Sequence, residues 1–277
     1  MMYSPKQMKQ TLEEENFNFK KKFGQNFIVD ENIIYSIIKK SEINKDTLVI
    51  EIGPGAGSLT SKLGEVAKNV LAYEIDKTVK NILEKNIKPN TKIIYDDFLK
   101  RNVKEDIKDY AYDKLYVVAN LPYYITTPII MKLIEENIDI DKIVIMVQKE
   151  VGNRFKAKPN TKEYNSLSVY LNYFFDVEKI IDVSRNVFMP KPNVDSIVLS
   201  LTKKEKIKVE NEEVFFKLVK SSFTQKRKTL KNNLKSYDLE KVEEVLRRHN
   251  LDLSVRAESL PLEIFAEISN NLNKNIH

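Results

Sequence analysis

A glycine-rich loop and an acidic residue beyond it are the first features of this chain that predict binding chemistry. The loop, Gly53-Pro-Gly55-Ala-Gly57, joins an apolar strand-like run to a helix-like run. Glycine tolerates positive φ and lets the backbone approach a ligand closely. Glu74 ends the next strand-like run, 21 residues after Gly53, where a carboxylate can accept hydrogen bonds from ribose hydroxyls. Gly53, Gly55 and Glu74 are therefore predicted to bind a nucleoside-containing cofactor.

The spacing of the glycines separates two classes of nucleotide-dependent enzyme. Oxidoreductases use G-x-G-x-x-G, and Ser58 stands where the third glycine of that fingerprint would be. The pattern that begins at Glu51 is E-x-G-x-G-x-G, which is typical of methyltransferases. Their cofactor, S-adenosylmethionine, has no pyrophosphate to cradle. The loop therefore favours an S-adenosylmethionine site.

Three further residues are predicted to contact the adenine of that cofactor. Asp97 ends the third strand-like run, where its carboxylate can accept from the exocyclic amine. Phe98 beside it and Ile75 next to Glu74 are placed to sandwich the ring. The alternative role for Asp97 is a helix N-cap, which is common where a strand leads into a helix.

The tetrapeptide Asn120-Leu121-Pro122-Tyr123 ends the fourth strand-like run and predicts the chemistry. The lone pair of an exocyclic adenine nitrogen is delocalised into the ring. The Asn120 amide oxygen and the Leu121 carbonyl, accepting both N–H bonds, would draw that nitrogen toward tetrahedral geometry. Pro122 fixes the turn because its φ is locked, and Tyr123 offers a face on which the extruded base can stack. The tetrapeptide predicts methyl transfer to that nitrogen.

Several catalytic classes are excluded by residues that the chain lacks. There is no Cys, and the only two histidines are His249, in a polar helix-like run, and the terminal His277. A thiolate nucleophile and a Cys-bound zinc are therefore ruled out. A multi-histidine metal site would have to use His249, for which a solvated position on a helix is favoured, and no metal is expected. Methyl transfer to an adenine amine needs no strong base, because the methylated amine loses its proton to water.

The elements that must position these residues are read from the periodicity of the apolar residues. Five continuous, β-branched runs predict buried parallel strands at 48–53, 70–75, 92–96, 115–120 and 142–148. Helix-like runs at 58–67, 77–86 and 127–136 supply the crossovers of a doubly wound sheet. Two more strand-like runs, 168–177 and 195–202, are expected to extend one edge as an antiparallel pair.

The sequence pattern changes after Lys203. A charged connector there leads into four helix-like runs without intervening strands. We expect a mobile segment at 1–19, an α/β domain of the Rossmann-like methyltransferase type at 20–205, and a small all-helical domain at 206–277. The sheet of the α/β domain is expected to be mostly parallel and seven-stranded.

Positive charge concentrates at the start of the helical domain. The chain carries 46 Lys and Arg against 40 Asp and Glu, a net charge of +6. Between Lys217 and Lys235 there are seven basic residues and no acidic ones. Leu230 and Leu234 suggest a helix with an apolar seam, whose basic face is either a solvated surface or an RNA phosphate contact. The RNA contacts predicted there are Lys226, Arg227, Lys228 and Lys231.

Nothing in the chain predicts a membrane protein or an exported one. No apolar run approaches the roughly 18–20 residues of a transmembrane helix, and the first ten residues do not resemble a signal peptide. A cytoplasmic location is expected.

Five motifs occur in an order that identifies a family. They are GQNFIVD (24–30), EIGPGAGSLT (51–60), NLPYYITTPII (120–130), QKEV (148–151) and VFMPKPNVDS (187–196). Together they resemble the ribosomal RNA adenine N6-dimethyltransferases, of the bacterial KsgA/RsmA type that acts on 16S rRNA. The resemblance extends from about residue 20 to the C-terminus, and residues 1–19 match nothing in the family.

The resemblance implies roles for residues that the spacing alone does not identify. Asn26 and Ile28 are implied to contact S-adenosylmethionine, together with Gly53, Glu74, Asp97 and Asn120. Phe188 matches the aromatic residue that the family places opposite the Tyr123-type residue around the target adenine. Core packing beside a proline-rich turn is the alternative role for Phe188.

The activity implied by the resemblance is dimethylation of N6 on each of two adjacent adenosines in the 3′-terminal hairpin loop of 16S rRNA, within a partly assembled small subunit. No obligate protein partner is expected, and the chain is expected to be a monomer. Two alternatives stay open. One is a 23S rRNA adenine methyltransferase of the macrolide-resistance type, and the other is a ribosome-assembly factor without catalytic activity. NLPYYITTP argues against the first, and the intact Gly53, Glu74 and Asn120 argue against the second.

Overall fold

A computed structural model describes residues 10–12, 14, 17, 19–20, 24–121 and 125–273. Contacts between residues divide the chain into two compact units. The first comprises residues 1–152 and 178–202, and the second comprises 153–177 and 203–277. The segment 153–177, which the sequence analysis placed in the α/β domain, thus belongs to the second unit.

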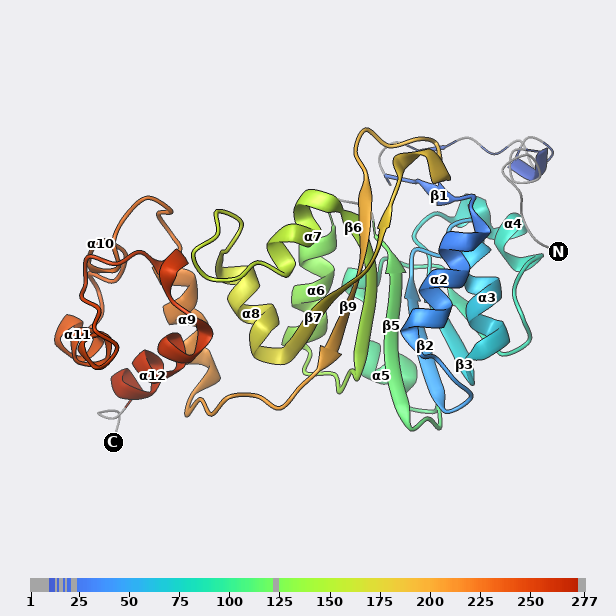
Figure 1. Cartoon of the computed structure of the whole chain (residues 1–277). Helices are drawn as coiled ribbons and strands as arrows, with labels where there is room; N and C mark the ends of the chain where they lie inside the picture. The colour runs from blue at the N-terminus through green and yellow to red at the C-terminus, as the bar shows by residue number, and fades with distance from the viewer. Residues whose placement is uncertain are drawn as a thin grey trace. The chain divides into compact units, whose positions relative to one another are not determined.

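A seven-stranded sheet forms the centre of the first unit, with strand order β4-β3-β2-β5-β6-β9-β7 (Figure 1). The first five of these strands in the order are parallel, and β9 runs antiparallel to β6. Their bounds are β2 Thr47–Ile52, β3 Asn69–Tyr73, β4 Thr91–Ile94, β5 Lys114–Asn120, β6 Lys142–Gln148, β7 Phe175–Val183 and β9 Ser196–Lys203. The expected mostly parallel sheet of seven strands is confirmed.

Helices lie on both faces of this sheet, which explains why its central strands are apolar on both sides (Figure 1). All six residues of β2 are buried. On one face, Val49 and Val118 share a core cluster with Ile37 and Leu63, which lie on α2 and α3. From Gly24 onward, the described helices of this unit are α2 Glu31–Ser41, α3 Ser58–Val66, α4 Lys80–Glu84, α5 Val103–Ile107 and α6 Thr126–Glu135, with short 3-10 turns at Lys77–Val79, Phe98–Lys100 and Arg185–Val187. α7, Lys149–Phe155, crosses the boundary between the units.

A separate two-stranded sheet joins two motifs that are far apart in sequence. β1 (Phe27–Ile28) pairs antiparallel with β8 (Phe188–Met189), so that Ile28 lies opposite Phe188. Near β1, Leu12 is buried, and the rings of Phe17 and Phe19 lie 5.8 and 5.4 Å from that of Phe27. The described part of the segment expected to be mobile therefore packs on Phe27.

The strand expected at 168–177 is wrong, because residues Ser166–Phe174 form helix α8 and β7 begins only at Phe175. A continuous apolar run fits a buried helix as well as a buried strand. Here the residues at the start of the segment favour the helix. The Asn165 side chain accepts from the backbone N–H of Leu167, and the Ser168 hydroxyl accepts from the N–H of Asn165 in a capping box.

The second unit is helical beyond residue 203, as expected. Its helices are α8, α9 Glu212–Ser222, α10 Leu230–Asn233, α11 Leu239–Arg248 and α12 Leu262–Asn273, with a 3-10 turn at Ala257–Ser259. The helix expected to carry the basic run is shorter than predicted, because residues 225–228 lie in an exposed turn ahead of α10. Leu230 and Leu234 are fully buried. No helix among the described residues is long and apolar enough to cross a membrane.

Candidate cofactor and catalytic site

The glycine loop folds as the sequence requires, with all three glycines in the left-handed region. Gly53, Gly55 and Gly57 have φ of +74°, +56° and +87°, and Gly57 caps α3. A Cβ atom on Gly55 would lie 2.7 Å from the ring of Phe27. The loop and the segment after Gly24 are therefore packed too closely for any other residue at position 55.

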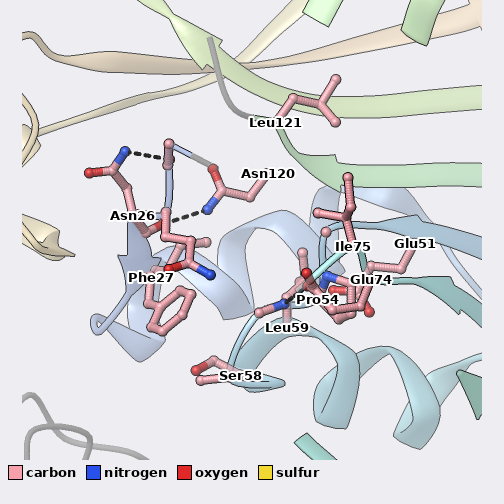
Figure 2. A pocket seen from close by; sticks show the side chains of 16 residues that line it. Asn26, Phe27, Glu51, Pro54, Ser58, Leu59, Glu74, Ile75, Asn120 and Leu121 are labelled. Atoms are coloured by element: carbon pink, nitrogen blue, oxygen red, sulfur yellow. Dashed lines mark hydrogen bonds between the residues drawn. The ribbon is translucent and has the colours of Figure 1, made fainter. Parts of the chain in front are cut away.

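A pocket of about 790 Å³, its open mouth included, lies at the carboxyl ends of β2, β3 and β5 (Figure 2). This is the edge where α/β sheets bind their ligands. The predicted site residues that line it are Asn26, Ile28, Gly53, Gly55, Glu74, Ile75, Asn120 and Leu121. The fold therefore brings four separate stretches of sequence to one cavity.

Glu74 is buried at the end of β3, and both of its carboxylate oxygens accept backbone hydrogen bonds. The Gly55 N–H donates to Oε2 at 3.0 Å, and the Asp76 N–H donates to Oε1 at 2.7 Å. Burial raises the pKa of Glu74 in spite of these donors. A carboxylate oxygen can accept more than one hydrogen bond. The Glu74 carboxylate is therefore held by its two backbone donors and can still accept a hydrogen bond from a ligand hydroxyl.

The Asn120 amide is oriented by Asn26, which lies 94 residues earlier in the chain. Its Nδ2 donates to the carbonyl oxygen of Asn26 at 2.9 Å, and the Nδ2 of Asn26 donates to the Gly24 carbonyl at 3.0 Å (Figure 2). Because a carbonyl can only accept, the Asn120 nitrogen is turned toward Asn26. The Asn120 Oδ1 is left as the acceptor, which is the atom that the predicted mechanism needs.

The rest of the tetrapeptide is described only at Leu121. This residue is buried, lines the pocket, and donates its N–H to the Met146 carbonyl on β6 at 3.3 Å. Pro122 and Tyr123 lie outside the described residues, so their roles stay predictions.

Three predicted residues are placed elsewhere than on the pocket lining. Asp97 caps the turn at Phe98–Lys100, and its Oδ1 accepts from the Leu99 N–H at 3.0 Å. Phe98 is buried edge-on against Tyr73, with ring centroids 5.1 Å apart. Phe188 is buried in the cluster that contains Ile28. Their contacts with adenine stay predictions. Asp97 has the capping role and Phe188 the packing role that are their alternatives, and Phe98 packs against Tyr73.

Glu51, which begins the E-x-G-x-G-x-G pattern, lines the pocket although its place in the pattern predicts no role for its side chain. It is 2% exposed, and its Oε2 has no hydrogen-bond partner among the described residues. Burial raises the pKa of Glu51 to about 8; the nearby Thr60 hydroxyl lowers this pKa and the charge of Glu74 raises it. The hydroxyl of Ser58, also on the lining, is likewise without a described partner.

These unpartnered atoms fit the cofactor that the glycine loop predicts. Buried polar groups are rarely left without hydrogen bonds, and the amino group of S-adenosylmethionine is a donor of the kind that the Glu51 Oε2 lacks. Glu74 suits the ribose hydroxyls, and the half-exposed Ile75 offers an apolar face to the adenine. The described residues contain no cluster of three His, Cys, Asp or Glu side chains that could hold a metal ion.

The predicted RNA contacts lie on the second unit and are exposed. Lys226, Arg227 and Lys228 occupy the turn before α10, and Lys231 lies on that helix. The Nζ of Lys226 donates to the Lys162 carbonyl at 2.7 Å. The sequence placed these charges correctly on the surface, but their contact with RNA stays a prediction.

Comparison with known proteins places the chain in a family. Residues 16–274 match the family described as ribosomal RNA adenine dimethylase. A curated relative from Macrococcus caseolyticus, named ribosomal RNA small subunit methyltransferase A, is 47% identical over 98% of this chain and 96% of its own. The protein of that name from Clostridioides difficile is 42% identical over 97% and 96%.

Solved structures agree with this assignment. A dimethyladenosine transferase from Plasmodium falciparum has a TM-score of 0.77 and 27% identity, covering 90% of this chain and 98% of its own. The 23S rRNA methyltransferase ErmE has a TM-score of 0.67 and 25% identity, covering 89% and 99%. The chain belongs to the ribosomal RNA adenine dimethylase family, which consists of S-adenosylmethionine-dependent methyltransferases.

Proposed function

We propose that this protein transfers methyl groups to N6 of two adjacent adenosines in the 3′-terminal hairpin loop of 16S rRNA, dimethylating each. Its substrate is a partly assembled small ribosomal subunit. The observation that carries the proposal is the fixed orientation of Asn120 in a pocket suited to S-adenosylmethionine. With Nδ2 bonded to the Asn26 carbonyl, Oδ1 is available to an incoming amine.

The proposed site residues have separate tasks in this reaction. Glu74 and the glycine loop bind the cofactor, which when bound supplies an electrophilic methyl group. The Asn120 Oδ1 and the Leu121 carbonyl accept the two N–H bonds of the adenine amine. This localises the nitrogen lone pair so that it can attack. The methylated nitrogen then loses its proton to water, so the chain needs no general base. Tyr123 and Phe188 are proposed to hold the extruded base.

Small-subunit rRNA is the substrate that the relatives favour. The curated proteins at 42 and 47% identity both carry the small-subunit name. ErmE, which is named for 23S rRNA, shares only 25% of its residues with this chain. The exposed residues Lys226, Arg227, Lys228 and Lys231 are proposed to contact rRNA phosphates. We further propose that the protein acts as a cytoplasmic monomer, bound to no membrane and without an obligate protein partner.

The test uses ribosomal subunits from a strain that lacks this protein. Purified small and large subunits are each incubated with the protein and S-adenosylmethionine, and rRNA fragments are weighed by mass spectrometry. We expect up to four added methyl groups in the 3′-terminal hairpin fragment of 16S rRNA and none in 23S rRNA. Methylation of 23S rRNA alone would assign the protein to the macrolide-resistance type. Binding to small subunits without methylation of either rRNA would make it an assembly factor.

A further inference from the structure

Asp76 is a buried carboxylate next to the cofactor pocket that does not itself line it. Its side chain is 1% exposed, which is unusual for an aspartate unless it is fully paired. Lys20 Nζ donates to Oδ1 and Gln25 Nε2 donates to Oδ2, both at 2.7 Å. The backbone N–H and the hydroxyl of Thr78 also donate to Oδ1, at 3.1 and 2.7 Å.

These hydrogen bonds connect two walls of the pocket that are distant in sequence. Gln25 belongs to the segment 24–28, which lines one side. The Asp76 backbone N–H donates to the Glu74 Oε1 at 2.7 Å, so the same residue also holds the acid at the end of β3. The Gln25 Oε1 in turn accepts from the Lys20 N–H at 2.8 Å, which closes a ring of hydrogen bonds among Lys20, Gln25 and Asp76.

The charge of Asp76 is part of this arrangement. Burial alone would raise its pKa, but the hydrogen bonds from Lys20, Thr78 and Gln25 outweigh burial, and the pKa of Asp76 is lowered. Hydrogen bonds to a charged group are stronger than those between neutral groups. The ring is therefore held chiefly by an ionised carboxylate.

We propose that Asp76 is a positioning residue for S-adenosylmethionine. Through its hydrogen bonds with Lys20 and Gln25, Asp76 holds Lys20 and the segment 24–28 against the Glu74 edge of the pocket. The segment also contains Asn26, whose carbonyl orients Asn120. Asp76 acts by fixing the two walls at the spacing that the cofactor requires. The inference rests on the proposed function only in taking S-adenosylmethionine as the ligand, and it holds whichever rRNA is the substrate.

Asp76 also has a purely structural task, because it is the N-cap of the 3-10 turn at Lys77–Val79. Asparagine serves equally well as an N-cap. Asp76→Asn therefore keeps the cap and removes the charge that binds Lys20. Lys20→Met removes the charge from the other partner, whose side chain is about one third exposed, and leaves the cap untouched.

The experiment measures cofactor affinity without RNA by isothermal titration calorimetry with S-adenosylmethionine, on the full chain. We expect Asp76→Asn and Lys20→Met each to raise the Kd about tenfold. The double variant should be little worse than Asp76→Asn alone, because both changes break one ion pair. Lys20→Arg keeps the charge and should restore most of the affinity. The matched control is Lys179→Met, which breaks a surface pair of the same 2.7 Å length, with Asp182.

A steady-state assay on undermethylated subunits separates positioning from general damage. The KM for S-adenosylmethionine should rise with the Kd, whereas kcat at saturating cofactor should fall by a smaller factor, because the segment reaches Asn120 only through the Asn26 carbonyl. Wild-type affinity in Lys20→Met would overturn the proposal even if Asp76→Asn failed to fold. Equal penalties in Lys20→Met and Lys179→Met would also overturn it. Failure to methylate 16S rRNA would leave these cofactor affinities measurable and would count against the proposed function alone.

Discussion

The cofactor pocket and the basic run at 226–231 use polar groups in opposite ways. In the pocket, Glu74 is buried and fixed by two backbone N–H groups, and the Asn120 amide is fixed by the Asn26 carbonyl. In the basic run the side chains are exposed, and they lie mostly in a turn. Buried polar groups have large and specific effects when one partner is removed, whereas exposed charges contribute little individually and are screened by salt.

This difference teaches how each region should respond to mutation. Removing one polar atom from the pocket should strongly reduce cofactor affinity or the rate of methyl transfer. Removing charges from the basic run should reduce affinity for RNA by a small step per charge. It also explains why the pocket is recognisable from short motifs and the basic run only from its net charge.

The largest effect is expected for Asn120→Ala. Loss of the acceptor should reduce kcat about a thousandfold, on the scale seen when one stabilising group is removed from an active site. The cofactor Kd should rise by a much smaller factor than kcat falls, because Asn120 lines the pocket but Glu74 and the glycine loop are untouched. Transfer from radiolabelled S-adenosylmethionine to undermethylated small subunits measures kcat, and calorimetry measures the Kd. Asn186→Ala, an exposed asparagine of the same unit, is the control. A wild-type rate in Asn120→Ala would remove it from the mechanism.

The second effect concerns pH and the buried Glu51. Its pKa is about 8 in the folded protein and 4.5 in its unperturbed form. At pH values between 4.5 and about 8, the Glu51 carboxyl is protonated in the folded state and ionised in the unfolded state. The stability contributed by this proton is therefore complete below pH 4.5 and falls as pH rises toward 8. Glu51→Gln stays neutral throughout. We expect the ligand-free variant to gain about 3 kcal/mol relative to the wild type between pH 5 and pH 8.

Urea unfolding at several pH values from 5 to 8 measures this difference in the free energy of unfolding. Glu105→Gln, whose wild-type side chain is 62% exposed, should show no such trend. A constant difference between Glu51→Gln and the wild type would mean that Glu51 is ionised in the folded protein. Glu51 would then no longer support the contrast between buried pocket groups and exposed charges.

Glu74→Gln tests the other buried acid. An amide presents one oxygen and one NH2 group, so it cannot accept from both the Gly55 and the Asp76 N–H groups as the carboxylate does. One backbone donor would be left unpaired, and the ribose would lose a charged acceptor. We expect the Kd for S-adenosylmethionine to rise about 30-fold, with kcat at saturating cofactor nearly unchanged. Unchanged affinity by calorimetry would remove Glu74 from the ribose site.

The sequence predicts those parts of the fold and site that depend on local pattern. Continuous β-branched runs locate the parallel strands, and the glycines of the loop mark positions where φ must be positive. Helix α8 was missed because an apolar run fits a buried strand as well as a buried helix, and the deciding signal is a capping box formed by Asn165 and Ser168. Exposure of the basic run was predicted, but the length of its helix was not.

Partnerships between distant residues are the part that local pattern cannot supply. The Asn26 carbonyl orients Asn120, 94 residues away, and Asp76 accepts from Gln25, 51 residues away. Glu51 stands in the motif itself, yet its burial without a partner appears only once α3 and the sheet enclose it. These features arise from packing, so a motif can name the residues but not the bonds among them.

The smallest effect is expected from the basic run, and it has a signature that the pocket variants lack. Reversing Lys226, Arg227 and Lys228 to Glu should reduce affinity for small subunits about tenfold at moderate salt. The slope of log affinity against log salt concentration should fall by about 2–3, since each phosphate contact contributes about 0.9. Binding of S-adenosylmethionine should be unchanged. Filter binding over a range of salt concentrations measures both quantities.

Reversal of Lys104 and Lys108, two exposed lysines of the first unit, controls for the change in net charge. If these changes lower the slope as much per residue as those at 226–228, the attraction is a property of the whole protein, and the turn before α10 has no special role. If only the triple variant alters the slope, its side chains contact phosphates directly. Each single reversal within the turn should then contribute a similar share, because exposed charges act nearly independently, in contrast to the linked groups around the cofactor.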